Sequence, residues 1–304
     1  MSGAWKILIS DPLHPEAVAW LQRQPGASVV VRSEISPEDL LQTIADYDAL
    51  IVRSRTKVTA GVIAAGRRLK VIGRAGTGLD NIDLEAAQRA RITVLNAPGA
   101  NANAVAELTL GLMIALARDL PQAMQAAKAG TKIKGYGSEL MGKTLGVIGY
   151  GRIGRRVAHV ALALDMRVLA YDILKPEPLE PGVELVSLAE LCSRSDWVSL
   201  HIPLTPETRH FVSARLLEQF KVGAFLINTA RAEIVDEEAV LEALQQGRLR
   251  GYATDVISEN SALLGHPRVL VLPHIGASTE EAQRRAGMEI VERVWQALLD
   301  HQDL

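Results

Sequence analysis

Cysteine is almost absent from this sequence: its 304 residues include only one, Cys192. A chain with one cysteine cannot form an internal disulfide, and such usage is typical of proteins in a reducing compartment. We therefore expect a cytoplasmic location. Cys192 lies between Leu191 and Ser193 at an expected helix end, which favours a structural role over a nucleophilic one.

An excess of positive charge is absent too. Lys and Arg total 33 against 35 for Asp and Glu, a formal net charge of −2. Proteins that bind nucleic acid or anionic membranes usually carry basic stripes or clusters, so neither partner is expected. The sequence has no Cys/His pairing at metal-ligand spacing and no HExxH motif, so no metal site is expected.

Long apolar runs are also missing. The longest, Leu108–Ala117, is about half of what a bilayer crossing needs and is more typical of a helix buried between domains or subunits. The chain opens on an expected strand, Trp5–Ile9, instead of a basic and then apolar segment. No signal peptide is therefore expected.

What the chain does have is an alternation of apolar, β-rich runs with helical patterns, which is typical of parallel sheets covered by helices on both faces. A first series of strands is expected at Lys6–Ser10, Ser28–Arg32, Ala49–Arg53, Leu69–Gly73 and Ile92–Asn96. A second series is expected at Leu145–Gly149, Arg167–Asp172, Trp197–Pro203, Ala224–Thr229, Gly251–Val256 and Val269–Pro273. The predicted fold class is α/β, with two Rossmann-like doubly wound parallel-sheet domains and an interdomain cleft.

The strongest motif is a glycine-rich turn. Leu145–Gly154 reads LGVIGYGRIG, an apolar strand that runs into Gly149-x-Gly151-x-x-Gly154 and a helix-forming segment. Such glycines let the backbone approach a pyrophosphate, and the N–H groups of the helix start favour an anion. Asp172 ends the next strand, at the spacing of about 20 residues expected for a ribose-binding acid. Because its carboxylate would repel a 2′-phosphate, we predict NAD as the cofactor.

The order of the elements predicts a discontinuous first domain. The last helix, expected at Thr279–Leu299, follows the second series of strands and is expected to return to the first. A chain of this length is long enough for two domains. We predict a substrate-binding domain of residues 1–97 and 278–304 and an NAD-binding domain of residues 98–277.

Two further side chains follow apolar strands of the second series. Arg231, in Asn228–Arg231, is suited to bidentate binding of a carboxylate. His274, in Leu272–Gly276, is suited to general acid/base catalysis because its pKa lies near neutral pH. Taken singly, a surface salt bridge and a structural histidine would be the better interpretations; together, beside a dinucleotide site, they favour catalysis. His201 is expected to line the nicotinamide side without catalysing.

Several segments are shared, in order, with one known family. They are VRSRTKVT (Val52–Thr59), GRAGTGLDNIDL (Gly73–Leu84), NAPGANANAVAEL (Asn96–Leu108), GKTLGVIGYGRIG (Gly142–Gly154), NTARAEIVDEEAV (Asn228–Val240) and PHIGASTEEAQ (Pro273–Gln283). The chain resembles the D-isomer-specific 2-hydroxyacid dehydrogenases, most closely their D-3-phosphoglycerate dehydrogenase branch. The resemblance runs from about Ile7 to Val294.

The resemblance implies that Arg231 binds the substrate carboxylate and that His274 is the acid/base. It also implies substrate contacts from the loop that includes Ala75 and Gly76. The NAD contacts that it implies, with the glycine turn included, are Thr77, Gly149, Gly151, Arg152, Ile153, Gly154, Asp172, His201, Ile202, Pro203, Thr229, Ala230, Arg231, Asp255, His274 and Gly276. A homodimer formed through the segment matching Ala100–Leu140 is implied as well.

The chain departs from the family around the partner of the catalytic histidine. In the family a glutamate lies five residues after the aspartate that matches Asp255; here that position is Asn260, with Glu259 one place earlier. The following loop is shortened, so either Glu259 takes the role or Asn260 orients His274 without a charge. The shortened loop slightly favours Glu259. Ala232 replaces a common glycine.

A second anionic group on the substrate is indicated by Arg53 and Arg74, which end adjacent strands of the first series. Either arginine is equally compatible with a solvated structural role. The Arg/Lys pair that helps to bind phosphate in the family is represented only by Lys132 and Lys134, which weakens the substrate assignment more than the reaction.

These observations predict an NAD-dependent oxidoreductase that interconverts a 2-hydroxy acid and its 2-keto acid, with 3-phosphoglycerate and 3-phosphohydroxypyruvate or a similar pair as substrates. Alternatives within the enzymes are a hydroxypyruvate or glyoxylate reductase and a sulfonated 2-hydroxy-acid dehydrogenase. A different class, a non-catalytic NAD-sensing binding protein, uses the same fold.

Overall fold

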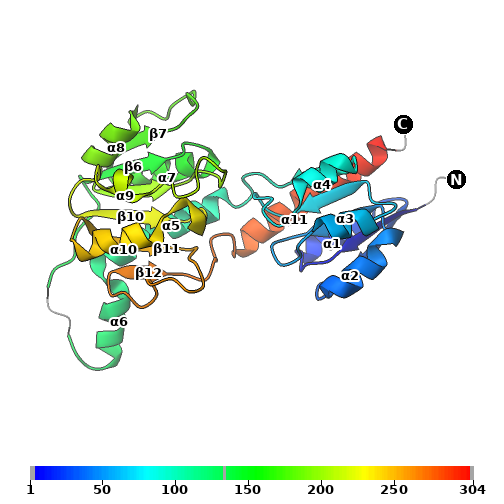
Figure 1. Cartoon of the computed structure of the whole chain (residues 1–304), viewed down its shortest axis with the longest axis horizontal. Helices are drawn as coiled ribbons and strands as arrows, with labels where there is room; N and C mark the ends of the chain where they lie inside the picture. Colours follow the sequence, from blue (N-terminus) through cyan, green and yellow to red (C-terminus); the bar gives the residue numbers. More distant parts are fainter. Residues whose placement is uncertain (1–3, 133–134, 302–304) are drawn as a thin grey trace. The chain divides into compact units, whose positions relative to one another are not determined.

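The computed structural model describes residues 4–132 and 135–301, and the chain forms two compact units (Figure 1). The first unit combines the residues up to Asn101 with those from Ala277 onward, and the second runs from Ala102 to Gly276. The first unit is therefore discontinuous in sequence, and the second is inserted into it as one continuous stretch.

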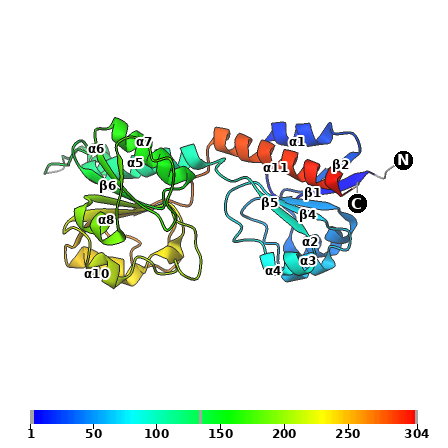
Figure 2. The same ribbon diagram turned by 90° about the horizontal axis from the view of Figure 1, so that it is seen from above.

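The first unit is built on a five-stranded parallel sheet. Its strands are β1 (Trp5–Ile9), β2 (Ala27–Val31), β3 (Ala49–Val52), β4 (Val71–Arg74) and β5 (Thr93–Asn96), in the spatial order β2-β1-β3-β4-β5. Its helices are α1 (Pro15–Gln22), α2 (Pro37–Thr43), the 3-10 turn η1 (Ile44–Asp46), α3 (Ala60–Ala65), α4 (Leu84–Arg89) and α11 (Glu280–Asp300). Figure 2 shows α1 and α11 on one face of this sheet and α2, α3 and α4 on the other.

Alternation along the strands explains why both faces of this sheet are covered. Leu8 of β1 lies in the apolar core beneath α2 and α3, whereas Ile7 and Ile9 lie in the core beneath α1 and α11. Side chains of a strand point to opposite faces in turn, so an apolar run buries both. Helix α11 lies very close to β4, because a Cβ atom at Gly73 would come 2.4 Å from Val294 Cγ2.

The second unit contains a seven-stranded sheet, also parallel throughout. Its strands are β6 (Thr144–Ile148), β7 (Arg167–Tyr171), β8 (Val183–Leu185), β9 (Trp197–Leu200), β10 (Ala224–Asn228), β11 (Leu249–Thr254) and β12 (Val269–Val271). The spatial order is β12-β11-β10-β9-β6-β7-β8. The chain first runs outward from β6 in one direction and then returns to the other side of β6 at β9. This reversal is the switch point at which doubly wound sheets bind their ligands.

Helices cover both faces of the second sheet. They are α5 (Ala102–Arg118), α6 (Leu120–Lys128), α7 (Arg152–Ala163), α8 (Leu188–Arg194), α9 (Ala214–Leu217), η2 (Ala232–Ile234) and α10 (Glu237–Gln245). Figure 2 shows α5 and α7 on one face and α8 and α10 on the other. The apolar core between this sheet and helices α5 and α7 includes Val147, Val157 and the stacked rings of Trp197 and Phe225. The centroids of the two rings are 4.0 Å apart.

The prediction of two α/β domains with parallel sheets is confirmed, but several details were wrong. Strand β11 is Leu249–Thr254 instead of Gly251–Val256, and β12 ends at Val271 instead of Pro273. Strand β8 was missed, because Val183–Leu185 is a three-residue edge strand with two exposed positions and no apolar run. Strand β9 ends at Leu200 and not at Pro203. The last ladder bond there is donated by the His201 N–H to Ile148, and Pro203 has no N–H to continue the pattern.

In the part of the chain that the structure describes, no helix combines the length and apolar character that crossing a membrane requires.

Candidate active site

The segments singled out in the second unit follow the carboxyl ends of its strands. The glycine turn follows β6, Asp172 follows β7, and His201–Pro203 follows β9. The remaining segments, which follow β10, β11 and β12, are Thr229–Arg231, Asp255 and His274–Gly276. Because all seven strands are parallel, their carboxyl ends lie along one edge of the sheet, which we call the carboxyl edge.

The three glycines of the turn have three different physical roles. Gly149 has a φ of +93°, and a Cβ atom there would lie 2.6 Å from the His201 carbonyl oxygen. A Cβ at Gly154 would lie 2.0 Å from the Gly149 oxygen, so only glycine lets α7 pack so closely on the turn. At Gly151 the space is open, with no atom within 4 Å of a Cβ.

Helix α7 begins directly after this opening and has no side-chain cap. Gly151 is its N-cap residue, and the first helical hydrogen bond, 2.9 Å long, runs from Arg155 N to Gly151 O. The preceding N–H groups at the helix start have no partner within the helix. The open backbone at Gly151 and this uncapped start, with Arg152 and Ile153 in the first turn, fit a dinucleotide pyrophosphate.

Asp172 is held against the glycine turn. Its Oδ2 accepts a hydrogen bond of 2.8 Å from Tyr150 N, and its Oδ1 accepts one of 2.9 Å from Leu174 N. Two backbone donors therefore fix the orientation of this half-buried carboxylate at the end of β7. Its remaining lone pairs are suited to accepting ribose hydroxyls.

His201 is a neutral wall of the site. Burial lowers the pKa of its imidazole to about 3, and Ser199 Oγ lies 2.9 Å from His201 Nε2. An imidazole with so low a pKa is neutral near pH 7 and is a weak general base. That His201 lines the site without catalysing stays a prediction.

The turn that carries Arg231 is braced by the buried amide of Asn228. Asn228 Nδ2 donates to Arg231 O at 2.9 Å, and Asn228 Oδ1 accepts from Ala230 N at 3.0 Å. Thr229 Oγ1 lies 3.2 Å from Thr109 Oγ1 of α5. Arg231 Nη1 donates to the Ala230 carbonyl at 2.8 Å, and its side chain is half-buried. A planar guanidinium is the group best suited to bidentate binding of a carboxylate.

Asp255 positions the segment that carries His274. This aspartate is 2% exposed, and its two oxygens accept hydrogen bonds from Ile275 N at 2.8 Å and Gly276 N at 2.6 Å. A Cβ atom at Gly276 would approach Asp255 Oδ2 to 2.9 Å, so the close contact requires glycine. His274 itself is exposed and has a left-handed φ of +57°, a conformation that the hydrogen bonds to the next two residues hold in place.

The two candidate partners of His274 are both on the surface. Glu259 and Asn260 lie in an exposed turn after β11. The neighbouring Ser258 N donates to Glu237 Oε1 at 2.9 Å, which ties the start of this turn to α10. Within the described residues, neither Glu259 nor Asn260 makes a hydrogen bond to His274, so the choice between them stays a prediction.

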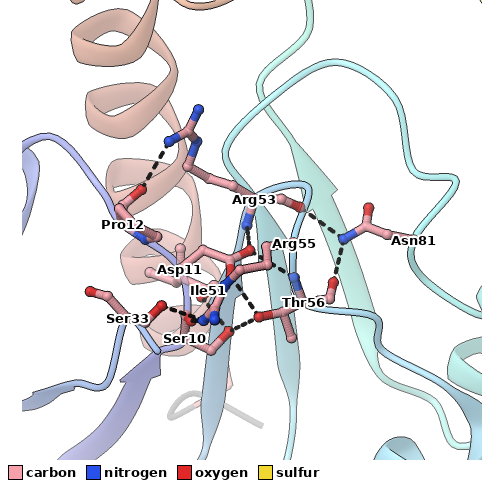
Figure 3. Close-up of polar contacts among 9 residues, drawn as sticks. All are labelled: Ser10, Asp11, Pro12, Ser33, Ile51, Arg53, Arg55, Thr56 and Asn81. Atoms are coloured by element: carbon pink, nitrogen blue, oxygen red, sulfur yellow. Dashed lines mark hydrogen bonds and ion pairs between the residues drawn. The ribbon is translucent and has the colours of Figure 1, made fainter. Parts of the chain in front are cut away.

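In the first unit, a polar cluster follows β1 and β3 (Figure 3). At its centre is Asp11, which is 1% exposed. Its Oδ2 accepts from Arg53 N at 2.6 Å and from Thr56 N at 3.1 Å, and its Oδ1 accepts from Thr56 Oγ1 at 2.7 Å and Arg55 Nε at 3.3 Å. Asn81 Nδ2 clamps the same turn by donating to the carbonyls of Arg53 and Thr56.

The side chains of the two arginines in this cluster differ in how many hydrogen bonds they make. Arg55 donates to the carbonyls of Ser10 and Ser33 as well as to Asp11, so its side chain is fixed. The Arg53 side chain makes one hydrogen bond, from Nη1 to Pro12 O at 3.3 Å. Burial lowers the pKa of Arg53 and the nearby Asp11 charge raises it again. The half-buried Arg53 guanidinium thus keeps most of its donors for another acceptor.

The other substrate-loop residues follow β4. Ala75 N donates to Val52 O at 2.8 Å, and a Cβ at Gly76 would come 2.5 Å from Arg74 Nη1, so the Arg74 guanidinium lies over Gly76. Thr77 belongs to the first unit, where its Oγ1 lies 2.9 Å from Asn101 Oδ1. Of the two lysines that alone represent the family's phosphate-binding Arg/Lys pair, Lys132 is exposed and Lys134 lies outside the described residues.

Sequence reasoning missed Asp11, Arg55 and Asn81, although Asp11 had a visible signal. It is an acid directly after an apolar strand, the pattern that drew attention to Asp172. The roles of Arg55 and Asn81 depend on bonds to distant carbonyls, which leave no local signal. Across the described residues there is no group of three or more His, Cys, Asp or Glu side chains that could hold a metal ion.

With this geometry in place, comparison with known proteins defines the class. A model of the NAD-binding domain of D-isomer specific 2-hydroxyacid dehydrogenases matches residues 110–276, and the chain belongs to this family. It therefore carries the NAD-binding domain of that family, on the sheet with the glycine turn.

Individual members of the family can be compared with the chain over most of its length. The chain is 46% identical over 302 residues to D-3-phosphoglycerate dehydrogenase of Methanocaldococcus jannaschii, covering 96% of this chain and 57% of that one. It is 44% identical over 303 residues to hydroxypyruvate reductase of Thermotoga maritima, covering 97% and 98%. A solved NAD⁺-bound 3-phosphoglycerate dehydrogenase of Entamoeba histolytica matches with a TM-score of 0.82, 32% identity and coverage of 98% and 97%. The chain thus spans just over half the length of the first of these relatives.

Proposed function

We propose that this chain is an NAD-dependent oxidoreductase that interconverts a 2-hydroxy acid and its 2-keto acid. One observation carries the proposal. Arg231, Asp255 and His274 follow the neighbouring strands β10, β11 and β12 on the same edge as the glycine turn. An anion-binding guanidinium, a fixed acid/base segment and a dinucleotide turn on one sheet edge are the parts that such a reaction needs.

In oxidation, Arg231 binds the substrate carboxylate and polarises the oxygen on C2. His274 accepts the hydroxyl proton as the C2–O bond becomes a carbonyl, and it returns that proton in reduction. Asp255 keeps His274 in place through the backbone of the two following residues. NAD, when bound, supplies the acceptor or donor of the hydride.

NAD, and not NADP, is proposed as the cofactor because the fixed Asp172 carboxylate would repel a 2′-phosphate. The kcat/KM values with NADH and NADPH test this choice. We expect a clear preference for NADH that narrows in Asp172→Ala, which loses both the repulsion and the ribose hydrogen bonds. Equal values in the unaltered protein would contradict the proposal.

For the substrate, we propose a 2-hydroxy acid with a second anionic group, such as 3-phosphoglycerate. Arg53, with most of its donors uncommitted by internal bonds, supports this. A hydroxypyruvate reductase is the second candidate, because the relative of that name matches over nearly its full length. A panel of 3-phosphohydroxypyruvate, hydroxypyruvate, glyoxylate and a sulfonated keto acid, assayed by NADH consumption, separates these. NADH binding without turnover of any keto acid would instead favour the sensor class.

We also propose a homodimer formed through α5 and α6. Large apolar side chains are exposed there: Ile114 is 42%, Leu120 39% and Met124 60% exposed. Helix α6 has no fully buried side chain. Sedimentation of the protein over a range of concentrations tests this, and Met124→Glu is expected to shift the equilibrium towards monomer.

A further inference from the structure

A polar pocket lies at the edge of the second sheet opposite the carboxyl edge, where the parallel strands begin. Its volume is about 680 Å³, and it is lined by residues at or near the starts of β6, β7, β8, β9 and β10 and by the end of α8. Strand β6 has five residues and so separates the two edges by roughly 16 Å. The pocket is therefore distinct from the carboxyl edge and has no part in the proposed reaction.

The two carboxylates in this pocket are each neutralised by a neighbouring cation. Arg194 donates two hydrogen bonds to Glu184, of 2.9 and 2.8 Å, and these lower the pKa of Glu184. Lys221 Nζ donates to Asp196 Oδ1 at 2.7 Å. The second oxygen of Asp196 accepts from Thr144 N at 2.9 Å.

Two more cations line the same pocket. Lys143 lies just before β6, and Arg167 is the first residue of β7. Among the described residues neither of them forms an ion pair, and both side chains are exposed. Four cations against two carboxylates leave a local surplus of two positive charges, on a chain whose overall formal charge is −2.

The volume and the lining of the pocket limit which kinds of ligand can bind there. Its floor includes Met166 and Val168, which are only 4% and 2% exposed. A volume of this size is in the range of about 300–1,000 Å³ that is typical of small-molecule sites. A nucleic acid would instead need an extended basic stripe, and here Glu184 and Asp196 interrupt the cations.

We propose that this pocket binds a small dianion, with Lys143 and Arg167 as the residues that pair with its two charges. A phosphate monoester and a dicarboxylate share this chemistry. Charge-assisted hydrogen bonds from an ammonium and a planar guanidinium suit both, because Arg offers two parallel donors to either group.

Methyl NMR of the full chain tests the proposal, with glycerol 3-phosphate and succinate as separate probes at constant ionic strength. Met166 and Val168 report on the pocket, and Ile153 and Ile202 report on the carboxyl edge. We expect saturable shifts at Met166 and Val168 with at least one probe. Saturation by glycerol 3-phosphate alone assigns a phosphate monoester, and saturation by succinate alone assigns a dicarboxylate. Shifts confined to Ile153 and Ile202, or no saturable shift with either probe, would overturn the proposal.

Charge-removing variants make the test specific. Lys143→Gln/Arg167→Gln is expected to weaken binding at least tenfold. The matched control Lys128→Gln/Arg215→Gln removes the same charge from exposed positions on α6 and α9 and is expected to bind like the unaltered chain. Equal affinity of the pocket variant and the control would refute the assignment. Should the double variant melt early, Lys143→Gln alone replaces it, with the same expected direction.

Discussion

The helices that follow strands in the first unit differ from α7 of the second unit in how they begin. Helices α2, α3 and α4 start with Ser36, Thr59 and Asp83, and each of these side chains accepts a hydrogen bond from a backbone N–H of the first turn. Helix α7 starts with Gly151 and has no such acceptor. The first unit satisfies the starts of these three helices internally, whereas the start of α7 in the second unit is left available for a ligand.

The polar clusters at the strand ends differ in the same way. In the first unit, Asp11 accepts four hydrogen bonds from the turn after β3, so the buried carboxylate serves the fold. In the second unit, Asp255 is just as buried, but it fixes a segment whose first residue, His274, is exposed. The Asp11 carboxylate is saturated by the turn after β3, whereas Asp255 positions an exposed side chain that can take part in chemistry.

The largest effect is expected at His274. His274→Asn removes the acid/base and should lower kcat by about 10²–10⁴-fold while NADH binding is kept. The matched change in the first unit, His14→Asn, alters only the residue whose Nδ1 accepts from Glu16 N at the start of α1; kcat should be unchanged. Similar kcat values for the two variants would abolish the functional contrast between the units.

The partner of His274 is tested in the same assay. A carboxylate beside an imidazole stabilises its charged form and raises its pKa. If Glu259 is the partner, Glu259→Gln should lower the pKa seen in kcat/KM and weaken catalysis, and Asn260→Ala should be mild. The reverse order of severity would identify Asn260. Unchanged pH profiles in both variants would rule out both residues.

A second test exchanges the two kinds of helix start. Gly151→Asp would cap α7 but place a carboxylate where the pyrophosphate is proposed to bind. Because no atom lies within 4 Å of a Cβ at this position, the fold should tolerate it, while the NADH Kd should rise about a hundredfold, or ~2.7 kcal/mol. Thr59→Ala should instead cost about 1 kcal/mol of stability and leave NADH binding unchanged. Titration calorimetry and urea unfolding measure both, and an unaltered NADH Kd in Gly151→Asp would be inconsistent with a pyrophosphate at α7.

A third test separates the two arginines of the Asp11 cluster. Arg53→Gln should raise KM for a phosphorylated substrate by ten- to a hundredfold, the equivalent of losing a charge-assisted hydrogen bond of about 1.5–3 kcal/mol, and much less for a short substrate. Arg55→Gln breaks bonds within the fold, so it should lower thermal stability and affect all substrates alike. Equal KM changes for both substrates in Arg53→Gln would make Arg53 structural.

The smallest effect concerns pH. The native pKa of His201 is lowered to about 3, whereas in the unfolded chain it is about 6.5. Between these values the unfolded state binds an extra proton, so stability is present above pH 6.5 and is lost as pH falls towards 3. The slope from this residue is at most about 1.4 kcal/mol per pH unit. Urea unfolding at pH 7, 6 and 5 should show a shallower dependence for His201→Gln; parallel curves would contradict the burial of this ring.

The sequence allowed much of the fold to be predicted, because long apolar runs and glycines carry local signals. Gly149, Gly151 and Gly154 could be interpreted from spacing alone; the structure gives Gly149 and Gly154 separate steric reasons and leaves open space at Gly151. Strand β8 could not be found, since its three residues bury little.

That Asp255 positions the segment of His274 could not be predicted from the sequence either. Its bonds to the N–H groups of Ile275 and Gly276 join segments 20 and 21 residues apart, and backbone donors leave no trace in side-chain patterns. The same holds for the Asp11 cluster, where the partners are 42 to 45 residues away. Long-range polar contacts of this kind depend on how the strands are ordered, which one sequence does not specify.

The placement of α11 has a consequence for the order in which the chain folds during synthesis. One face of the first sheet is closed by Ile290, Val291, Val294 and Leu298 of this helix, which are translated about 190 residues or more after β5 ends at Asn96. At about 5–20 residues per second, the first sheet waits on the order of ten seconds or longer with only α1 on that face. The second unit, continuous from Ala102 to Gly276, has all its strands before α11 emerges. The domain that begins first along the chain is therefore completed last.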